Sequence, residues 1–370
     1  MASMPGSTST SNPARRRAGG VPGWLLGLVL LAGPAGASAP DLAATVLMYH
    51  HVGNAETPST SVTRTQFAAH LDYLARNDFN VVDLGEVVEA LRTREPLPDR
   101  TVAITFDDGY ESVGRVAHPM LAERGWPYTV FVNTRPVADG YSGYLTWAEM
   151  AAMADEGARF ANHSHRHVPL QLRRDNEARP QWRERVVNDI QTAQRRLVDR
   201  LGEAVHQDPP LLAYPFGEYS IELMDVVAEL GYVGLGQHSG AIGRHSNSLA
   251  LPRFPMNEHY ADMDGFAVKV DALPLPVVSQ TPLDPVREAD ELPTLTVTLA
   301  PDAAIPEARL ACFYQDQRLE PRWLEPGRRF AVQATGRLPV GRSRYNCTAP
   351  AGVGRFYWYS QLWIHGEAGT

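Results

Sequence analysis

The sequence predicts an α/β fold with a parallel sheet, followed by a small C-terminal β-sandwich. Strand-like and helix-like segments alternate between Thr45 and Leu235, as they do in repeated strand–helix units. Polar clusters stand directly after four of the expected strands. Beyond Pro293, short runs alternate apolar and polar residues, which is typical of strands with one buried face. The pattern does not separate a barrel from an open, doubly wound sheet.

The expected strands are short runs rich in β-branched, aromatic and aliphatic residues. They occupy residues 45–49, 102–106, 128–132, 159–162, 211–214 and 232–235. The segments between them carry apolar residues at helical spacing or a helix N-cap, which predicts helices at 66–76, 119–124, 146–156, 183–201 and 220–230. Thr146 and Glu149 have the spacing of a capping box, and Ser220 can cap the last of these helices.

The C-terminal part of the chain has a different composition. Residues 272–293 are rich in proline and polar side chains, which predicts a linker, and residues 294–370 are expected to form a small β-rich domain. Cys312 and Cys347 are the 2 cysteines of the chain. They either form a disulfide, as an exported protein permits, or remain two buried thiols.

The N-terminus has the three parts of a secretory signal peptide. Consecutive arginines at 15–17 precede an apolar run at 24–32, and small residues follow. The run is shorter than the about 20 residues that a membrane span needs. We therefore expect residues 1–39 to be a signal peptide cleaved near Ala37, with an uncleaved anchor as the alternative. Either arrangement places the bulk of the chain in the periplasm or outside the cell.

Charge and composition restrict the partners of the chain. The formal net charge is −8 over 370 residues, and the sequence has no polybasic segment, so a nucleic-acid partner is disfavoured. We expect no stable membrane span in the mature chain. The oligomeric state stays open at this point.

Two motifs carry the candidate chemistry: residues 105–110 (TFDDGY) and residues 162–167 (NHSHRH). Each follows an expected strand, and residues that follow parallel strands gather at one end of such folds. Two histidines four apart and a carboxylate from another strand suit zinc or a similar divalent ion, with coordination positions left for water and substrate. Each motif alone is weak, since Asp-Asp-Gly often forms only a turn. Their joint occurrence at strand ends is much more specific.

The motif Thr105-Phe106-Asp107-Asp108-Gly109, together with His163-Ser164-x-x-His167, resembles the polysaccharide deacetylase family, also called carbohydrate esterase family 4 or the NodB-homology domain. The resemblance covers residues 45–271 and implies a distorted, incomplete (β/α) barrel. It further implies that Asp107 is the general base and that Asp108, His163 and His167 bind a divalent metal. We expect that metal to be Zn²⁺, with Co²⁺, Ni²⁺ or Mn²⁺ as alternatives. His165 would lie beside the ligands without binding the metal.

The same resemblance suggests further site residues. Residues 212–217 (LAYPFG) resemble the third motif of the family, which implies that the backbone N–H of Tyr214 is an oxyanion donor. Leu211, just before them, stands where many members have an arginine that steadies the base. The orientation of Asp107 is therefore left unexplained. Tyr49-His50 resembles the first strand of the poly-β-1,6-N-acetylglucosamine deacetylase subgroup, which implies that His50 protonates the leaving amine. His259 and a purely structural His50 are the alternatives.

Three aromatic residues near the expected strand ends, Tyr110, Phe216 and Tyr219, are candidates to stack on sugar rings, although core packing is the common role of such residues. The function expected from all these features is hydrolysis of N-acetyl groups from an N-acetylglucosamine-containing polysaccharide. The alternatives are a different glycan, a non-catalytic carbohydrate-binding relative, and a non-haem iron oxygenase. The last generally has an all-β fold, which the strand–helix alternation disfavours.

Overall fold

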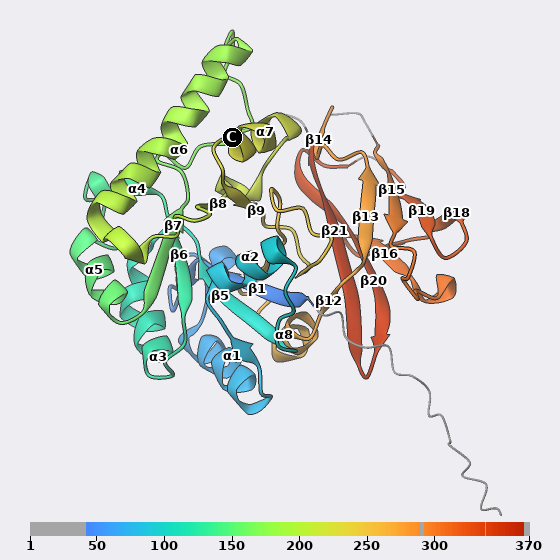
Figure 1. Ribbon diagram of the computed structural model, residues 1–370, viewed down its shortest axis with the longest axis horizontal. Helices are drawn as coiled ribbons and strands as arrows, with labels where there is room; N and C mark the ends of the chain where they lie inside the picture. The colour runs from blue at the N-terminus through green and yellow to red at the C-terminus, as the bar shows by residue number, and fades with distance from the viewer. Residues whose placement is uncertain (1–41, 289–291, 337, 366–370) are drawn as a thin grey trace, which may run out of the picture. The chain divides into compact units, whose positions relative to one another are not determined.

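The structure, a computed structural model, describes residues 42–288, 292–336 and 338–365 (Figure 1). The predicted signal peptide at 1–39 and its cleavage site lie outside these ranges. Among the described residues, no helix combines the length and the hydrophobicity of a membrane span.

A 9-stranded sheet forms the first part of the fold (Figure 1). Its strands are β1 (Ala43–Tyr49), β4 (Asn80–Val81), β5 (Thr101–Phe106), β6 (Tyr128–Val132), β7 (Ala158–Asn162), β8 (Leu211–Ala213), β9 (Val233–Leu235), β10 (Ala241–Gly243) and β11 (Phe254–Pro255). The order is β10-β1-β5-β6-β7-β8-β9, with β4 beside β5 and β11 beside β1. All pairs are parallel except β1 with β10. The sheet curls into an incomplete barrel, which confirms the predicted fold.

Helices connect the parallel strands, as strand–helix units require. They are α1 (Arg64–Arg76), α2 (Leu84–Thr93), α3 (His118–Ala122), α4 (Thr134–Ala138), α5 (Trp147–Asp155), α6 (Arg179–Leu201), α7 (Ile221–Glu229) and α8 (Met263–Val270). The predicted capping box of α5 is confirmed, since Thr146 Oγ1 accepts from Glu149 N at 3.2 Å and Glu149 Oε2 accepts from Thr146 N at 2.8 Å. Ser220 caps α7 as predicted.

Short segments complete this part of the chain. They are the two-residue strands β2 (His51–Val52) and β3 (Ser61–Val62), the π-helical turn η2 (Val113–Ala117), and the 3₁₀ turns η1 (Pro58–Thr60), η3 (Gly202–Ala204) and η4 (Pro215–Gly217). The turn η4 directly follows β8, so it lies at the same end of the sheet as the two sequence motifs.

Two further sheets form the C-terminal part, one 6-stranded and one 4-stranded. The first contains β12 (Leu273–Pro274), β14 (Val286–Arg287), β16 (Ala311–Tyr314), β17 (Gln317–Leu319), β20 (Gly341–Gly352) and β21 (Arg355–His365). The second contains β13 (Val277–Thr281), β15 (Thr294–Leu299), β18 (Arg322–Glu325) and β19 (Arg329–Gln333). The turn η5 (Glu307–Arg309) precedes β16. Apolar side chains of both sheets share one core, as in a sandwich.

The stretch predicted as a linker, residues 272–293, instead contributes strands. β12 and β14 pair with β21, and β13 pairs with β15. All three lie at sheet edges, where a proline without an N–H removes no ladder hydrogen bond. Proline content was therefore a misleading sign of a linker here.

Strand β21 contributes to two apolar cores. Trp363 belongs to the core between the two C-terminal sheets. Its neighbours Leu362 and Ile364 point to the opposite face, as alternation along a strand requires. There they pack in a cluster with Leu212 and Tyr214 of the α/β part.

The two cysteines are joined. Cys312 of β16 and Cys347 of β20 lie directly opposite one another in the register of the two strands and form a disulfide. The structure therefore decides between the two alternatives that the sequence left open.

Candidate active site

The carboxyl ends of β5 and β7 bring Asp108, His163 and His167 together. Asp108 Oδ1 lies 3.4 Å from His163 Nε2 and 3.2 Å from His167 Nε2. One potential ligand atom from each residue lies within 4.8 Å of the others. Asp108 and His163 are buried, and His167 is partly exposed. These are the residues that the sequence predicted as metal ligands, and their donor atoms can hold one metal ion.

Hydrogen bonds fix the loop that carries both histidines. Asn162 Oδ1 accepts from Ser164 N at 2.8 Å, and Ser164 Oγ accepts from His167 N at 3.0 Å. Asp189 of α6 accepts from the backbone N–H of His165 at 2.7 Å. Ser164 and His167 have φ values of 67° and 52°, a backbone conformation that costs a non-glycine residue about 1–3 kcal/mol. The hydrogen bonds hold the loop in this strained form.

The surroundings of His163 suit a bound cation. Its Nδ1 lies 2.8 Å from Ala213 O, so Nδ1 donates and Nε2 presents a lone pair. That Nε2 is buried and has no hydrogen-bond partner among the described residues. Burial alone would lower the pKa of His163, but the carboxylates of Asp107 and Asp108 outweigh it and raise that pKa. A centre that favours added positive charge and offers a buried lone pair fits a divalent metal ion.

Asp107 is held by an arginine that the sequence did not reveal. Arg253 donates from Nη1 and Nη2 to the two carboxylate oxygens of Asp107 at 2.7 and 2.8 Å. Arg253 also donates from Nε to Gly236 O at 2.9 Å, and both partners of the pair are fully buried. The arginine expected at the position of Leu211 is thus supplied by the residue directly before β11. Its only sequence signal is a single charge within an apolar, proline-flanked run.

Comparison with known proteins places these residues in a family. Residues 94–235 match the family described as polysaccharide deacetylase, and both motifs fall within that range. The chain contains a polysaccharide deacetylase domain. YxkH of Bacillus subtilis (strain 168), assigned by name to the polysaccharide deacetylases, is 28% identical over 209 residues, which are 56% of this chain and 69% of YxkH.

A second relative and a solved structure extend the comparison. The poly-β-1,6-N-acetyl-D-glucosamine N-deacetylase of Escherichia coli (strain K12) is 25% identical over 227 residues, which are 52% of this chain and only 33% of that protein. The Streptococcus pyogenes deacetylase PplD, in complex with acetate, aligns with a TM-score of 0.55 and 22% identity over 62% of this chain and 99% of PplD. The deacetylase domain therefore has the PplD fold.

The histidines that precede the first motif differ in their surroundings. His50, at the end of β1, is close enough to Asp107 and Asp108 of the deacetylase domain to interact with them electrostatically. His51 is buried and stacks on Tyr110 with ring centroids 3.7 Å apart. Burial, with the charge of His50, lowers the pKa of His51 to about 4. His259, the alternative acid, is exposed, and its backbone N–H donates to Asn257.

The three aromatic candidates lie in different environments. Tyr110 is partly exposed and packs between His51 and Tyr144. Phe216 is partly exposed, and its ring centroid lies 4.6 Å from that of His167. Tyr219 is only 5% exposed and lies in an apolar cluster that also contains Tyr214 and Leu223. The structure therefore does not support the predicted contact of Tyr219 with substrate, because core side chains cover its ring.

Tyr214 is also placed differently from the prediction. Its backbone N–H donates to Leu235 O at 3.0 Å, as part of the pairing of β8 with β9. Its hydroxyl donates to Leu249 O at 2.8 Å. The predicted oxyanion contact from Tyr214 N–H is wrong for this structure, because the sheet already uses that donor.

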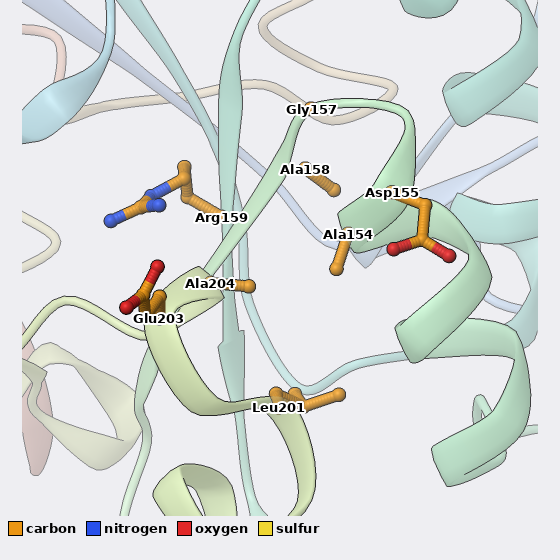
Figure 2. Close-up of a pocket in the computed structure, with 8 residues that line it drawn as sticks. All are labelled: Ala154, Asp155, Gly157, Ala158, Arg159, Leu201, Glu203 and Ala204. Atoms are coloured by element: carbon orange, nitrogen blue, oxygen red, sulfur yellow. The ribbon is translucent and has the colours of Figure 1, made fainter.

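A surface hollow lies away from these residues. Figure 2 shows its lining: Ala154, Asp155, Gly157, Ala158, Arg159, Leu201, Glu203 and Ala204. Ala158 begins β7, whereas His163 follows the end of that strand. The hollow is therefore at the opposite end of the strand from the deacetylase centre and shares no residue with it.

The buried pair of Arg253 and Asp107 leads to a stability prediction. We expect Arg253→Gln to lower the free energy of unfolding by about 3–5 kcal/mol, because it leaves a buried carboxylate without its counter-ion. The double variant Arg253→Gln with Asp107→Asn should recover much of this loss. Urea denaturation of the metal-free proteins measures both values.

The matched control removes an arginine from an exposed pair. Arg92 bonds Glu89 at 2.6 and 2.8 Å, but both side chains are solvent-exposed. We expect Arg92→Gln to leave the unfolding midpoint nearly unchanged. Equal losses in Arg253→Gln and Arg92→Gln would contradict the stabilising role of the buried pair.

Proposed function

We propose that this chain is a metal-dependent N-deacetylase that removes acetyl groups from a poly-N-acetylglucosamine-like polysaccharide and releases acetate. The observation that carries the proposal is the set of Asp107, Asp108, His163 and His167 within a polysaccharide deacetylase domain, in which the first three are buried. Asp108, His163 and His167 would hold the ion, with Zn²⁺ first and Co²⁺, Ni²⁺ or Mn²⁺ as alternatives. When bound, such an ion polarises the acetyl carbonyl and acidifies water.

Asp107 is proposed as the general base. Burial would raise its pKa, but the charges of Arg253 and His163 outweigh burial and hold that pKa below its ordinary value. The carboxylate is therefore ionised at neutral pH and able to accept a proton from the attacking water. Since a low pKa also makes a weak base, its contribution depends on the position that Arg253 fixes.

His50 is proposed as the general acid. Cleavage of the amide requires a proton on the leaving nitrogen, because an amide anion is a very poor leaving group. Of the two histidines considered, His50 is the one that interacts electrostatically with Asp107 and Asp108. His259 is exposed on a different loop.

The oxyanion donor is proposed to be the backbone N–H of Phe216. Tyr214 N–H is already paired in the sheet, and Pro215 has no N–H to donate. Phe216 has a φ of 60°, and its ring contacts the ligand candidate His167. A pre-positioned backbone donor of this kind stabilises charge that develops on the carbonyl oxygen.

Two further observations support the proposed substrate and the proposed location of the enzyme. A relative in Escherichia coli is named for deacetylation of poly-β-1,6-N-acetyl-D-glucosamine, which supports an N-acetylglucosamine polymer as substrate. The disulfide between Cys312 and Cys347 suits an exported protein. We therefore propose that the enzyme acts in the periplasm or outside the cell.

An acetate-release panel tests this proposal. We expect β-1,6-linked N-acetylglucosamine oligomers to be hydrolysed with a kcat/KM about tenfold or more above chitin oligomers, peptidoglycan fragments and acetylated xylan, a difference of about 1.4 kcal/mol. Preference for another member of the panel would overturn the substrate. No acetate from any member, with the metal bound, would indicate a non-catalytic relative.

A further inference from the structure

We propose that Arg342, in the C-terminal β-sheets, is a positioning residue for the deacetylase centre. Arg342 holds residues 214–218, the loop that carries Phe216, in position. The C-terminal sheets therefore contribute to the geometry of the site. The inference deepens the proposed function, and its activity readout rests on that function.

Two contacts join Arg342 to this loop. Its Nη1 donates to the backbone carbonyl of Phe216, and its Nε lies 3.5 Å from Glu218 Oε1. The planar guanidinium can engage both oxygens at once, whereas an ammonium group concentrates its charge at one point. Arg342 therefore fixes the loop on both sides of Gly217.

Through Glu218, Arg342 is also connected to the loop that carries His163 and His167. Glu218 is only 5% exposed, and its Oε2 accepts from Gln171 Nε2 at 2.6 Å. Gln171 is itself buried and lies four residues after His167 in the same loop. A continuous path of polar contacts thus runs from Arg342 through Glu218 to the segment that follows a proposed metal ligand.

The loop needs such support because its backbone is strained. Phe216 and Gly217 both have positive φ values, 60° and 69°. A side chain at Gly217 would meet Gln237 at 2.4 Å, so the chain passes very close to its neighbour there. A non-glycine residue such as Phe216 keeps this conformation only when its surroundings hold it. The contact of the Phe216 ring with His167 depends on that conformation.

The sheet, in turn, fixes Arg342. Arg342 is paired in register with Ile364 of β21, and Ile364 packs with Leu362 in the cluster that contains Tyr214. This apolar packing sets the distance between β20 and residues 214–218. It therefore holds the Arg342 guanidinium next to its acceptor oxygens on Phe216 and Glu218. Figure 1 shows β20 and β21 as the long pair of strands in this sheet.

The other end of the same hairpin supplies a matched control. Arg355 of β21 also reaches the α/β part, where its Nη1 lies 2.7 Å from Asp99 Oδ1 and its Nε donates to Asp271 O at 2.9 Å. Asp99 precedes β5, at the end of that strand opposite Asp107. Replacing Arg355 therefore removes an equivalent contact between the two parts of the chain, but away from the site.

The test compares Arg342→Met, Arg342→Lys and Arg355→Met in the full chain. We expect Arg342→Met to lower kcat/KM for acetate release by about tenfold or more, as displaced positioning groups do, with the metal content unchanged. Arg342→Lys should recover part of this loss, and Arg355→Met should stay within about twofold of the wild type. Arg342 is 38% exposed, so its variants should fold. Activity of Arg342→Met within twofold of the wild type, or an equal loss in Arg355→Met, would overturn the inference.

Hydrogen–deuterium exchange gives a readout that is independent of catalysis. We expect Arg342→Met to raise amide exchange in residues 168–172 and 214–218, and Arg355→Met to leave both segments unchanged. If the wild-type protein released no acetate, the proposed function would fail, and this comparison would still decide the positioning role. Unchanged exchange in both segments of Arg342→Met would refute it.

Discussion

Replacing Asp107 by asparagine is expected to lower kcat for acetate release by about 10²–10⁴-fold, the range that a general base supplies. Asparagine is close to aspartate in shape but cannot accept the proton of the attacking water. Asp108, His163 and His167 are untouched, so the metal content should remain that of the wild type. Acetate release measured in quenched samples gives kcat, and metal analysis of the same protein gives its metal content.

The control for this variant separates lost chemistry from lost structure. Asp107→Asn also leaves the buried Arg253 guanidinium without its carboxylate, which destabilises the fold. The double variant Asp107→Asn with Arg253→Gln removes that unpaired charge. We expect it to regain stability but not activity. Recovery of acetate release in the double variant would show that Asp107 is not the base.

Removal of a metal ligand should have an effect of similar size. We expect His163→Gln to lose the bound ion and to lower kcat/KM by about 10³-fold, since a catalytic metal supplies several kcal/mol of stabilisation to the transition state. Dialysis of the wild-type protein against a chelator should lower kcat/KM by the same factor. Added Zn²⁺ should then restore the activity of the wild type but not that of His163→Gln.

His165 provides the matched control within the same motif. It lies between the two proposed ligands in sequence, but its Nδ1 lies 2.9 Å from Thr134 Oγ1, outside the centre. We expect His165→Gln to keep the metal and to stay within about threefold of wild-type activity, because it loses only a partly buried hydrogen bond worth about 1 kcal/mol. Metal loss in His165→Gln equal to that in His163→Gln would contradict the ligand assignment.

The features that the sequence predicted depend on local patterns. The strand that ends before Asp107 and the strand that ends before His163 are apolar runs of ordinary length, and parallel strands bring their carboxyl ends together. The fold class therefore predicts that the two motifs meet, whereas the choice of Asp108, His163 and His167 within them came from the family resemblance. The capping box at Thr146 was predictable for the same reason, because both of its partners lie within one turn of helix.

The features that the sequence did not reveal depend on contacts between distant segments. Arg253 meets Asp107 across 146 positions, and Arg342 meets Phe216 across 126. No periodicity or spacing encodes such a pair. The prediction for Tyr214 failed for a related reason, since the pairing of β8 with β9 uses its N–H. Only the assembled sheet shows which backbone donors it already occupies.

Anomalous diffraction at the zinc edge, on crystals of the active, zinc-loaded protein, tests the central claim most directly. We expect one strong peak enclosed by Oδ1 of Asp108 and the Nε2 atoms of His163 and His167. A peak bound by other residues, or no peak in crystals whose dissolved protein still releases acetate, would contradict it.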